Sequence, residues 1–185
     1  MIKMIKRYIF LLFILNFVPV VGTGQTYPIY KNTSSIAVLD QDSLFTKSEW
    51  GRNILNEVES RVSILSKENR SIEKELEKEE LKLTELRKIK SKVEFDILAF
   101  EFDTKVKEIR DLQSNKQMQI NNFLNDNRKL FFEKITPFLL LFIDELGVEV
   151  LLNKDTVALA SLGSDITEAA IVIINRNLKI NWYYE

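Results

Sequence analysis

The 185-residue chain contains no cysteine and no histidine. Without these side chains there is no thiol nucleophile, the commonest general base is missing, and most transition-metal sites are excluded. The sequence also has no glycine-rich phosphate loop and no aspartate-rich calcium loop. We therefore expect no enzyme activity, no cofactor and no metal site. Because disulfides cannot form, stability must come from packing or from assembly.

Glycine and proline are scarce, with five and three in the whole chain, and neither occurs in the 85 residues from Arg52 to Thr136. These two residues are the strongest breakers of regular helices, so the run predicts a long helical insertion. Short β-prone segments flank it at residues 36–39 and 148–152. We expect a small sheet to bring the two ends of the insertion together.

The first 24 residues have a basic start at Lys3, Lys6 and Arg7, an apolar stretch and a small-residue end. These features are typical of a secretory signal peptide. We expect cleavage after Gly24, export and an extended leader over residues 25–35. The alternative is a retained anchor, which would give a membrane-tethered coiled-coil stalk.

Positive charge is not in excess, since the chain has 26 basic and 27 acidic residues. Removal of residues 1–24 leaves 23 basic and 27 acidic residues, a net charge of −4. A nucleic-acid surface needs clustered Lys and Arg that are not offset by carboxylates, so we expect no nucleic-acid partner.

The helical arm is expected over residues 47–136. Thr46 and Glu49 have the spacing of a capping box at its start. A seam with steps of three and four residues then predicts a coiled coil with three polar interruptions. Asn69 at one of them is either a register-fixing residue or a tolerated polar residue on a weakly packed arm. The twelve seam positions are Leu55, Val58, Val62, Leu65, Asn69, Ile72, Leu76, Glu79, Leu83, Leu86, Lys90 and Val93.

In the second half of the arm the pattern is less regular. A seam continues at Leu98, Phe102, Ile109 and Leu112, and then resumes one step out of phase at Ile120, Phe123 and Leu130. Such a stutter predicts a loosely packed coiled coil. An unbroken helix would hold the flanking strands more than ~120 Å apart. We therefore expect a fold-back, with the tip near residues 88–98.

Six side chains near this tip are candidate partner contacts. Phe95, Phe100 and Phe102 could contact a nonpolar partner, and Lys88, Lys90 and Lys92 could form a basic binding patch. The competing interpretation is that the phenylalanines pack the apex and that the lysines form a solvated helix end. The sequence alone favours this second interpretation.

The body is expected from residues 36–46 and 137–180. Pro137 should kink the returning helix or begin a new one, and Gly147 should end it. Strands at 148–152 and 156–161 are predicted to form a hairpin around residues 153–155. Asp165 as N-cap and Glu168 should open a last helix. The fold class is α+β, mostly α: a long antiparallel coiled-coil hairpin on a small three-stranded body.

A body of three short strands has open edges and more apolar surface than it can bury. Phe131, Phe132, Phe138, Leu139, Phe142 and Ile143 add to that surface. A cyclic oligomer that closes the strands into a barrel would cover both the edges and these side chains. The residues expected in this oligomer body are Ile36, Val38, Val148, Val150, Leu152, Phe138 and Phe142.

The order of these segments resembles the Skp/OmpH family of periplasmic chaperones over about residues 36–178. The resemblance rests on the signal segment, the strand at 36–39 with Asp40, the charged hairpin, the segment at 148–152 and the motif that starts at Asp165. It implies a homotrimer with a β-barrel body and three helical arms that hold unfolded outer-membrane proteins without ATP. Membrane contact would be only transient or through clients.

One feature departs from the best-known members, which are strongly basic. Residues 52–134 contain 18 basic and 17 acidic side chains. We therefore expect clients to be held by shape and apolar contact more than by electrostatic attraction. The alternative function is a structural spacer or adaptor of the cell envelope.

Overall fold

The computed structural model describes residues 35–178. The signal segment and nearly all of the expected leader lie outside the described residues, as does the C-terminal tail. Two long helices dominate the described part. The elements are β1 (Ile36–Leu39), α2 (Gln41–Lys47), α3 (Glu49–Leu86), α4 (Lys92–Glu145), β2 (Val150–Asn153), the 3-10 turns η1 (Lys154–Thr156) and η2 (Leu162–Ser164), and α5 (Thr167–Asn177).

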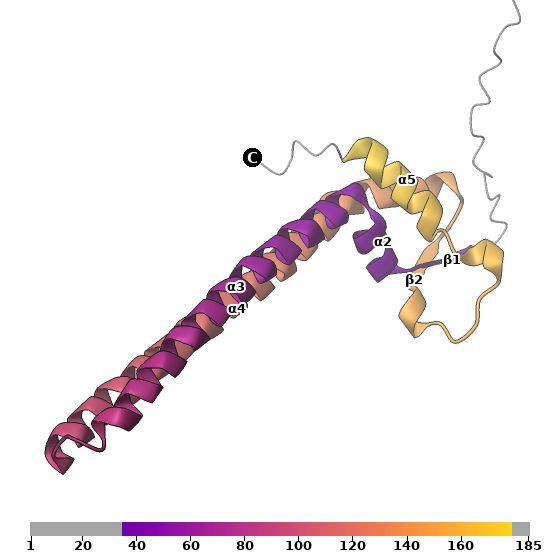
Figure 1. The fold of residues 1–185 in the computed structure, drawn as a ribbon. Helices are drawn as coiled ribbons and strands as arrows, with labels where there is room; N and C mark the ends of the chain where they lie inside the picture. Colours follow the sequence, from indigo (N-terminus) through magenta and orange to yellow (C-terminus); the bar gives the residue numbers. More distant parts are fainter. Residues whose placement is uncertain (1–34, 179–185) are drawn as a thin grey trace, which may run out of the picture. The chain divides into compact units, whose positions relative to one another are not determined.

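Helices α3 and α4 lie side by side and form the predicted helical hairpin (Figure 1). They contain 38 and 54 residues. The chain reverses over residues 87–91, where Ser91 caps α4. The Ser91 Oγ accepts a hydrogen bond from the Glu94 amide, and the Glu94 carboxylate accepts one from the Ser91 amide. This capping box is the local signal for the turn, and the Ser-x-x-Glu pattern at 91–94 shows it in the sequence.

The start of α3 differs from the prediction at Thr46 and Glu49. Ser48 is the N-cap, and its Oγ accepts a hydrogen bond from the Gly51 amide at 2.9 Å. Thr46 lies inside α2, where its hydroxyl donates to the Asp42 carbonyl. The prediction was wrong because Asp40, which accepts from the Ser43 amide at 2.8 Å, starts a separate short helix before α3.

The sheet pairs β1 with β2 in parallel, with Ile36 opposite Val150 and Leu39 opposite Asn153. The strand predicted at 156–161 is not a strand in the structure. The Asn153 side chain caps η1, and the Thr156 hydroxyl donates to the Asn153 carbonyl. These bonds turn the chain at the end of β2, so a hairpin does not form. The described residues therefore contain a two-stranded sheet.

Helix α4 continues through Pro137, where the sequence suggested a kink or a new helix. It ends at Glu145, and Gly147 follows with a φ of 68°. The Gly147 amide donates to the Asp144 carbonyl, and the Val148 amide donates to the Ile143 carbonyl. This is a Schellman motif, in which glycine adopts the left-handed conformation without steric cost. Its role as the end of the helix was predicted correctly.

The core of the body forms where α2, α5 and the ends of the hairpin meet. The Phe45 and Phe131 rings pack edge to face with centroids 5.3 Å apart. Trp50, Ile54 and Ile135 are buried in the same cluster. The core therefore already takes up part of the apolar surface that the sequence assigned to an oligomer interface.

Candidate functional site: the helical arm

The seam predicted along α3 faces α4. Leu65 is buried, and Leu55, Ile72, Leu76 and Leu83 are half-buried, whereas most of the residues between them are exposed. Lys90 in the hairpin turn and Val93 at the start of α4 are exposed. Val62, another predicted seam position, is 42% exposed. Apart from Val62, the coiled-coil periodicity gives the contact face of the outgoing helix correctly.

On α4 the predicted loss of phase after Leu112 is wrong. Leu112 and Leu130 point away from α3, with 60% and 36% of their surface exposed. The half-buried seam runs through Gln113 instead and continues to Ile120 and Asn127 without a change of step. The apolar pattern failed because polar residues occupy seam positions in the middle of the arm.

Ion pairs across the hairpin fix the alignment of its two helices. Lys105 Nζ lies 2.5 Å from Glu79 Oε2, and Lys116 pairs with Glu68. Nearer the body, the Arg61 guanidinium lies 3.9 Å from the centroid of the Phe123 ring. The two helices are antiparallel, so moving a given number of residues toward the start of α3 corresponds to moving the same number toward the end of α4. Pairs of this kind are exposed and stabilise only modestly, but they define which residues share a level.

The middle of the arm has a polar layer. The Asn69 Oδ1 is buried and has no hydrogen-bond partner among the described residues. Its neighbour Glu68 pairs with Lys116, and Gln113 occupies the next seam position on α4. A buried oxygen without a partner costs about 1–3 kcal/mol. This layer is therefore a weak point in the packing of the arm.

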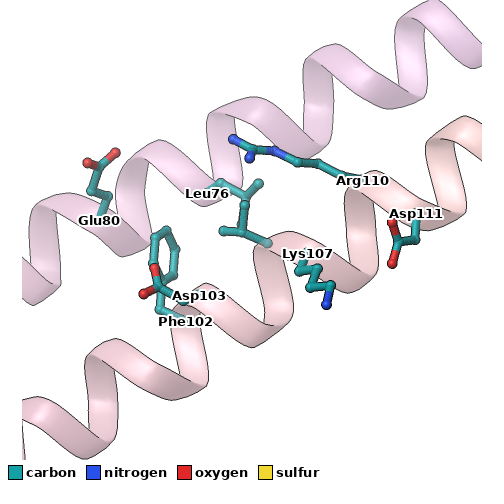
Figure 2. Close-up of a pocket in the computed structure, with 8 residues that line it drawn as sticks. Leu76, Glu80, Phe102, Asp103, Lys107, Arg110 and Asp111 are labelled. Atoms are coloured by element: carbon teal, nitrogen blue, oxygen red, sulfur yellow. The ribbon is translucent and has the colours of Figure 1, made fainter.

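A groove on one side of the hairpin has a volume of about 550 Å³ (Figure 2). Leu76 from α3 and Phe102 and Val106 from α4 give it an apolar floor. In Figure 2, Arg110 extends from α4 toward α3, next to Leu76. Charged side chains of both signs line the rest of the groove: Glu80, Asp103, Lys107, Arg110 and Asp111. An apolar floor with a mixed charged rim suits an extended, partly apolar polypeptide.

The six candidate tip residues are not brought together as one site. Phe95 and Phe102 are half-buried in the seam, and Phe102 also lines the groove. Phe100 lies on the opposite face of α4 and is 73% exposed. Lys88 pairs with Glu85 at 2.9 Å, Lys90 lies 3.7 Å from Glu94, and Lys92 is exposed.

The residues expected in the oligomer body also differ in exposure. Val38, Val148 and Phe142 are buried within this chain and offer no surface to a partner. Ile36, Val150 and Leu152 remain between 38% and 47% exposed. Phe138 is half-buried against the core. The difference arises because α2 and α5 cover part of the surface that the sequence left open.

Asp165 and Glu168 do not form the predicted capping box. The residue at the N-cap position of α5 is Ile166, and Asp165 Oδ1 accepts hydrogen bonds from the amide and the hydroxyl of Thr167. Glu168 instead pairs with Lys47 of α2 at 2.6 Å. The spacing correctly indicated a helix start. However, the Asp165 carboxylate accepts a hydrogen bond from the Thr167 amide, one residue before the Glu168 amide that a capping box would use.

A small polar network joins η1, the N-cap of α2 and the segment that precedes α5. Lys154 Nζ lies 2.9 Å from Asp165 Oδ2 and 3.9 Å from Asp40 Oδ2. Burial alone would raise the pKa of Asp165, but hydrogen bonds from Thr167 and Lys154 outweigh burial and hold this pKa below its usual value. The hydrogen bond from the Ser43 amide lowers the pKa of Asp40. The hydrogen bond to Asp165 raises the pKa of Lys154.

Within residues 35–178, neither a membrane-spanning helix nor a metal site is present. No helix in this range is both long and apolar enough to cross a membrane. The same residues contain no group of three or more acidic side chains placed to hold a metal ion.

Known proteins similar to this chain were found at the level of the family and of the fold. A family model described as "Outer membrane protein (OmpH-like)" matches residues 35–173. No curated protein matched the chain. Among solved structures, the chain resembles the crystal structure of a protein designated an OmpH-like outer membrane chaperone from Caulobacter crescentus CB15. The TM-score is 0.68 at 14% sequence identity, over 78% of this chain and 86% of that chain. At this identity the likeness bears on the fold alone.

Proposed function

Because this chain belongs to the OmpH-like outer membrane protein family, we propose that it is an ATP-independent holdase that binds unfolded outer-membrane proteins and prevents their aggregation. The family supports a chaperone role, and OmpH-like outer membrane chaperones are periplasmic. We place this protein in the periplasm as well, after cleavage of residues 1–24. The chemistry of the arm requires no cofactor for this activity.

One observation carries the proposal: the arm leaves large apolar side chains uncovered along its length. More than half of the surface is exposed at Ile64, Leu81, Leu112 and Met118. A folded partner with a polar surface would not bury these side chains, whereas an unfolded chain exposes apolar segments that can pack against them. The near-equal numbers of acidic and basic residues in the arm give little net electrostatic attraction.

We assign client contact to the groove over Leu76, Phe102 and Val106. Its apolar floor can bury a client side chain, and its charged rim keeps the surface soluble when it is empty. The polar layer around Asn69 lets the two helices adjust to clients of different shape, because its packing is weak.

We also propose that the protein acts as a trimer in which the strands close into a barrel. A two-stranded sheet has open edges and is marginal on its own. Ile36, Val150 and Leu152 are exposed on it. Assembly would cover both the edges and these side chains. Solution mass and small-angle scattering of residues 25–185 test this step, and a compact monomer would overturn it.

The functional test dilutes a urea-unfolded barrel protein into buffer with the chaperone and without nucleotide. Light scattering should fall as the chaperone is added. If a several-fold excess of chaperone does not suppress aggregation, the proposed holdase function is contradicted. Phe102→Ala should weaken suppression because it removes part of the groove floor. The matched control is Phe95→Ala, which removes another half-buried seam phenylalanine outside the groove and should leave suppression close to the wild-type level.

A further inference from the structure

The groove over Leu76, Phe102 and Val106 has a cation beside its apolar floor. Phe102, Val106 and Arg110 are spaced by four residues, so they share one face of α4. Side chains on a helix lean toward its N-terminus, which carries the Arg110 guanidinium back over the groove. Figure 2 shows this guanidinium next to Leu76 of α3, and the Phe102 ring lies further toward the hairpin turn. A side chain that enters the groove would therefore meet apolar atoms and a guanidinium together.

Other arginines of this chain show what such a guanidinium packs against. The Arg61 guanidinium of α3 lies 3.9 Å from the centroid of the Phe123 ring on α4. The Arg128 guanidinium of α4 lies 5.5 Å from the centroid of the Phe45 ring on α2. Arg110 differs, because no aromatic ring in the described part of the chain stacks on its guanidinium. At Arg110 the open groove takes the place that a ring fills at the other two arginines.

An aromatic side chain fits this arrangement better than an aliphatic one. An aliphatic occupant would remove water from the Arg110 guanidinium and give no attraction in return. An aromatic occupant can present the negative face of its ring to the guanidinium, and this contact is favourable even at exposed sites. The Phe102 ring adds a second contact, because aromatic pairs gain from edge-to-face or offset packing. The floor alone would accept either class, so Arg110 and Phe102 discriminate between them.

The charges on the rim disfavour an acidic occupant. Three carboxylates, those of Glu80, Asp103 and Asp111, line the groove together with two cations, Lys107 and Arg110. An acidic segment or an anionic lipid head group would meet more negative than positive charge there. The same carboxylates suit an aromatic ring, because the edge of a ring carries partial positive charge. The rim therefore favours a neutral ring whose face is turned toward Arg110.

We propose that the groove selects aromatic side chains of unfolded clients, and that Arg110 and Phe102 are the residues that recognise the ring. This inference rests on the holdase in the proposed function and names the part of a client that the groove binds. Transmembrane β-barrel proteins carry girdles of aromatic residues at both membrane interfaces. Their unfolded chains offer such side chains at intervals, and a ring held in the groove is kept from contact with other clients.

Peptide binding tests this selection directly. The probes are three fluorescent, unstructured peptides with the same host sequence and either tyrosine, leucine or glutamate at one guest position. The protein used for the aggregation test should bind the tyrosine peptide about two- to fivefold more tightly than the leucine peptide, as a cation–aromatic contact at an exposed site would give. The glutamate peptide should bind most weakly. Fluorescence anisotropy measures the three dissociation constants.

Arg110→Met separates the guanidinium from the apolar floor, because methionine keeps much of the apolar contact and removes the charge. Its affinity for the tyrosine peptide should fall to that for the leucine peptide, which should stay close to the wild-type value. The matched control is Arg70→Met. The Arg70 guanidinium donates to the carbonyl and hydroxyl oxygens of Ser66 on its own helix and lies outside the groove, so this variant should keep the preference for tyrosine. Circular dichroism confirms that both variants keep the helical fold.

Photocrosslinking locates the bound ring. A benzophenone amino acid at the guest position is itself aromatic and attaches to nearby C–H groups when it is illuminated. Mass spectrometry should find the adducts on residues 102–110 of α4 and around Leu76 of α3, and an excess of the tyrosine peptide should reduce them. Adducts confined to Phe100, which is exposed on the opposite face of α4, or to the body would overturn the assignment to the groove.

The remaining outcomes separate this inference from the holdase itself. Equal affinity for the tyrosine and leucine peptides, or no binding of either, in a protein that suppresses aggregation would overturn the aromatic selection and leave the holdase in place. A tyrosine preference that survives Arg110→Met would overturn the recognition by Arg110. Tightest binding of the glutamate peptide would show a site for negative charge instead. A tyrosine preference that depends on Arg110, in a protein that does not suppress aggregation, would support the aromatic site and contradict the holdase.

Discussion

Glu68 of α3 pairs with Lys116 of α4 beside Asn69, whose buried side-chain oxygen has no partner among the described residues. The centre of the arm is thus held by an exposed ion pair and not by apolar packing. Leu65 and Ile120 on the body side of this layer are both buried. The arm therefore has a firmly packed base and a weaker middle.

We expect Asn69→Leu to stabilise the arm by about 1–2 kcal/mol, because it replaces an unsatisfied buried amide with an apolar seam residue. Urea unfolding monitored by circular dichroism measures this gain. If the adaptability of the arm matters for holding clients, suppression of aggregation should weaken in the same variant. Asn122→Gln, at an exposed position on α4, is the control and should change neither property, because it keeps an amide and adds no large apolar surface. If Asn69→Leu destabilises the protein, the interpretation of this polar layer as a weak point in the packing is contradicted.

The capping box at the hairpin turn gives a second prediction. Ser91→Ala removes a side-chain acceptor from the start of α4 and should cost about 1 kcal/mol. Hydrogen exchange at the first amides of α4 should accelerate, while exchange in the body core stays unchanged. The control is Ser114→Ala, in the exposed interior of the same helix, where alanine is the better helix former. Equal exchange in both variants would show that the turn does not depend on this cap.

The sequence predicted the hairpin well because its signal is distributed over many residues. The α3 seam from Leu55 to Leu86 and the absence of glycine and proline all favour one structure. The errors occur where a single polar contact determines the local backbone structure. Asn153 turned a predicted hairpin into a 3-10 turn, and Asp40 started a short helix that moved the cap from Thr46 to Ser48.

The candidate site was harder to predict than the fold, because the same residue type can lie on either face of a helix. Phe100 and Phe102 are two residues apart, yet one is exposed on the outer edge and the other lines the groove. The apolar count near the tip could not separate them. Only the position of α3 relative to α4 shows which side each phenylalanine occupies.

The network of Lys154, Asp165 and Asp40 makes the stability of the body depend on pH. The pKa values of both carboxylates are lowered in the folded protein. Their contribution is therefore present above the unfolded pKa, near 3.8, and is lost as the pH falls below it. Asp165→Asn should lower the urea midpoint at pH 7, and the difference from wild type should shrink toward pH 3.

A matched control for the pH experiment is Asp126→Asn, at an exposed α4 position with no ion pair recorded in the described part of the chain. It should leave the urea midpoint near the wild-type value at pH 7. If Asp165→Asn stays equally destabilised at both pH values, the loss comes from packing or from the hydrogen bonds to Thr167, and not from the charge of the carboxylate.

Gly51 sits at the junction of α2 and α3, where no larger residue fits. A Cβ atom at this position would lie 1.7 Å from the Phe45 carbonyl oxygen, and both residues are buried. The strain falls on backbone that cannot move without disturbing Phe45, whose ring packs on Phe131. Gly51→Ala should therefore destabilise the body by at least about 2–3 kcal/mol, even though alanine is the better helix former. Gly163→Ala, which meets no atom within 4 Å, should be close to neutral in the same thermal unfolding measurement. A stable Gly51→Ala protein would mean that α2 does not approach α3 as closely as the structure shows.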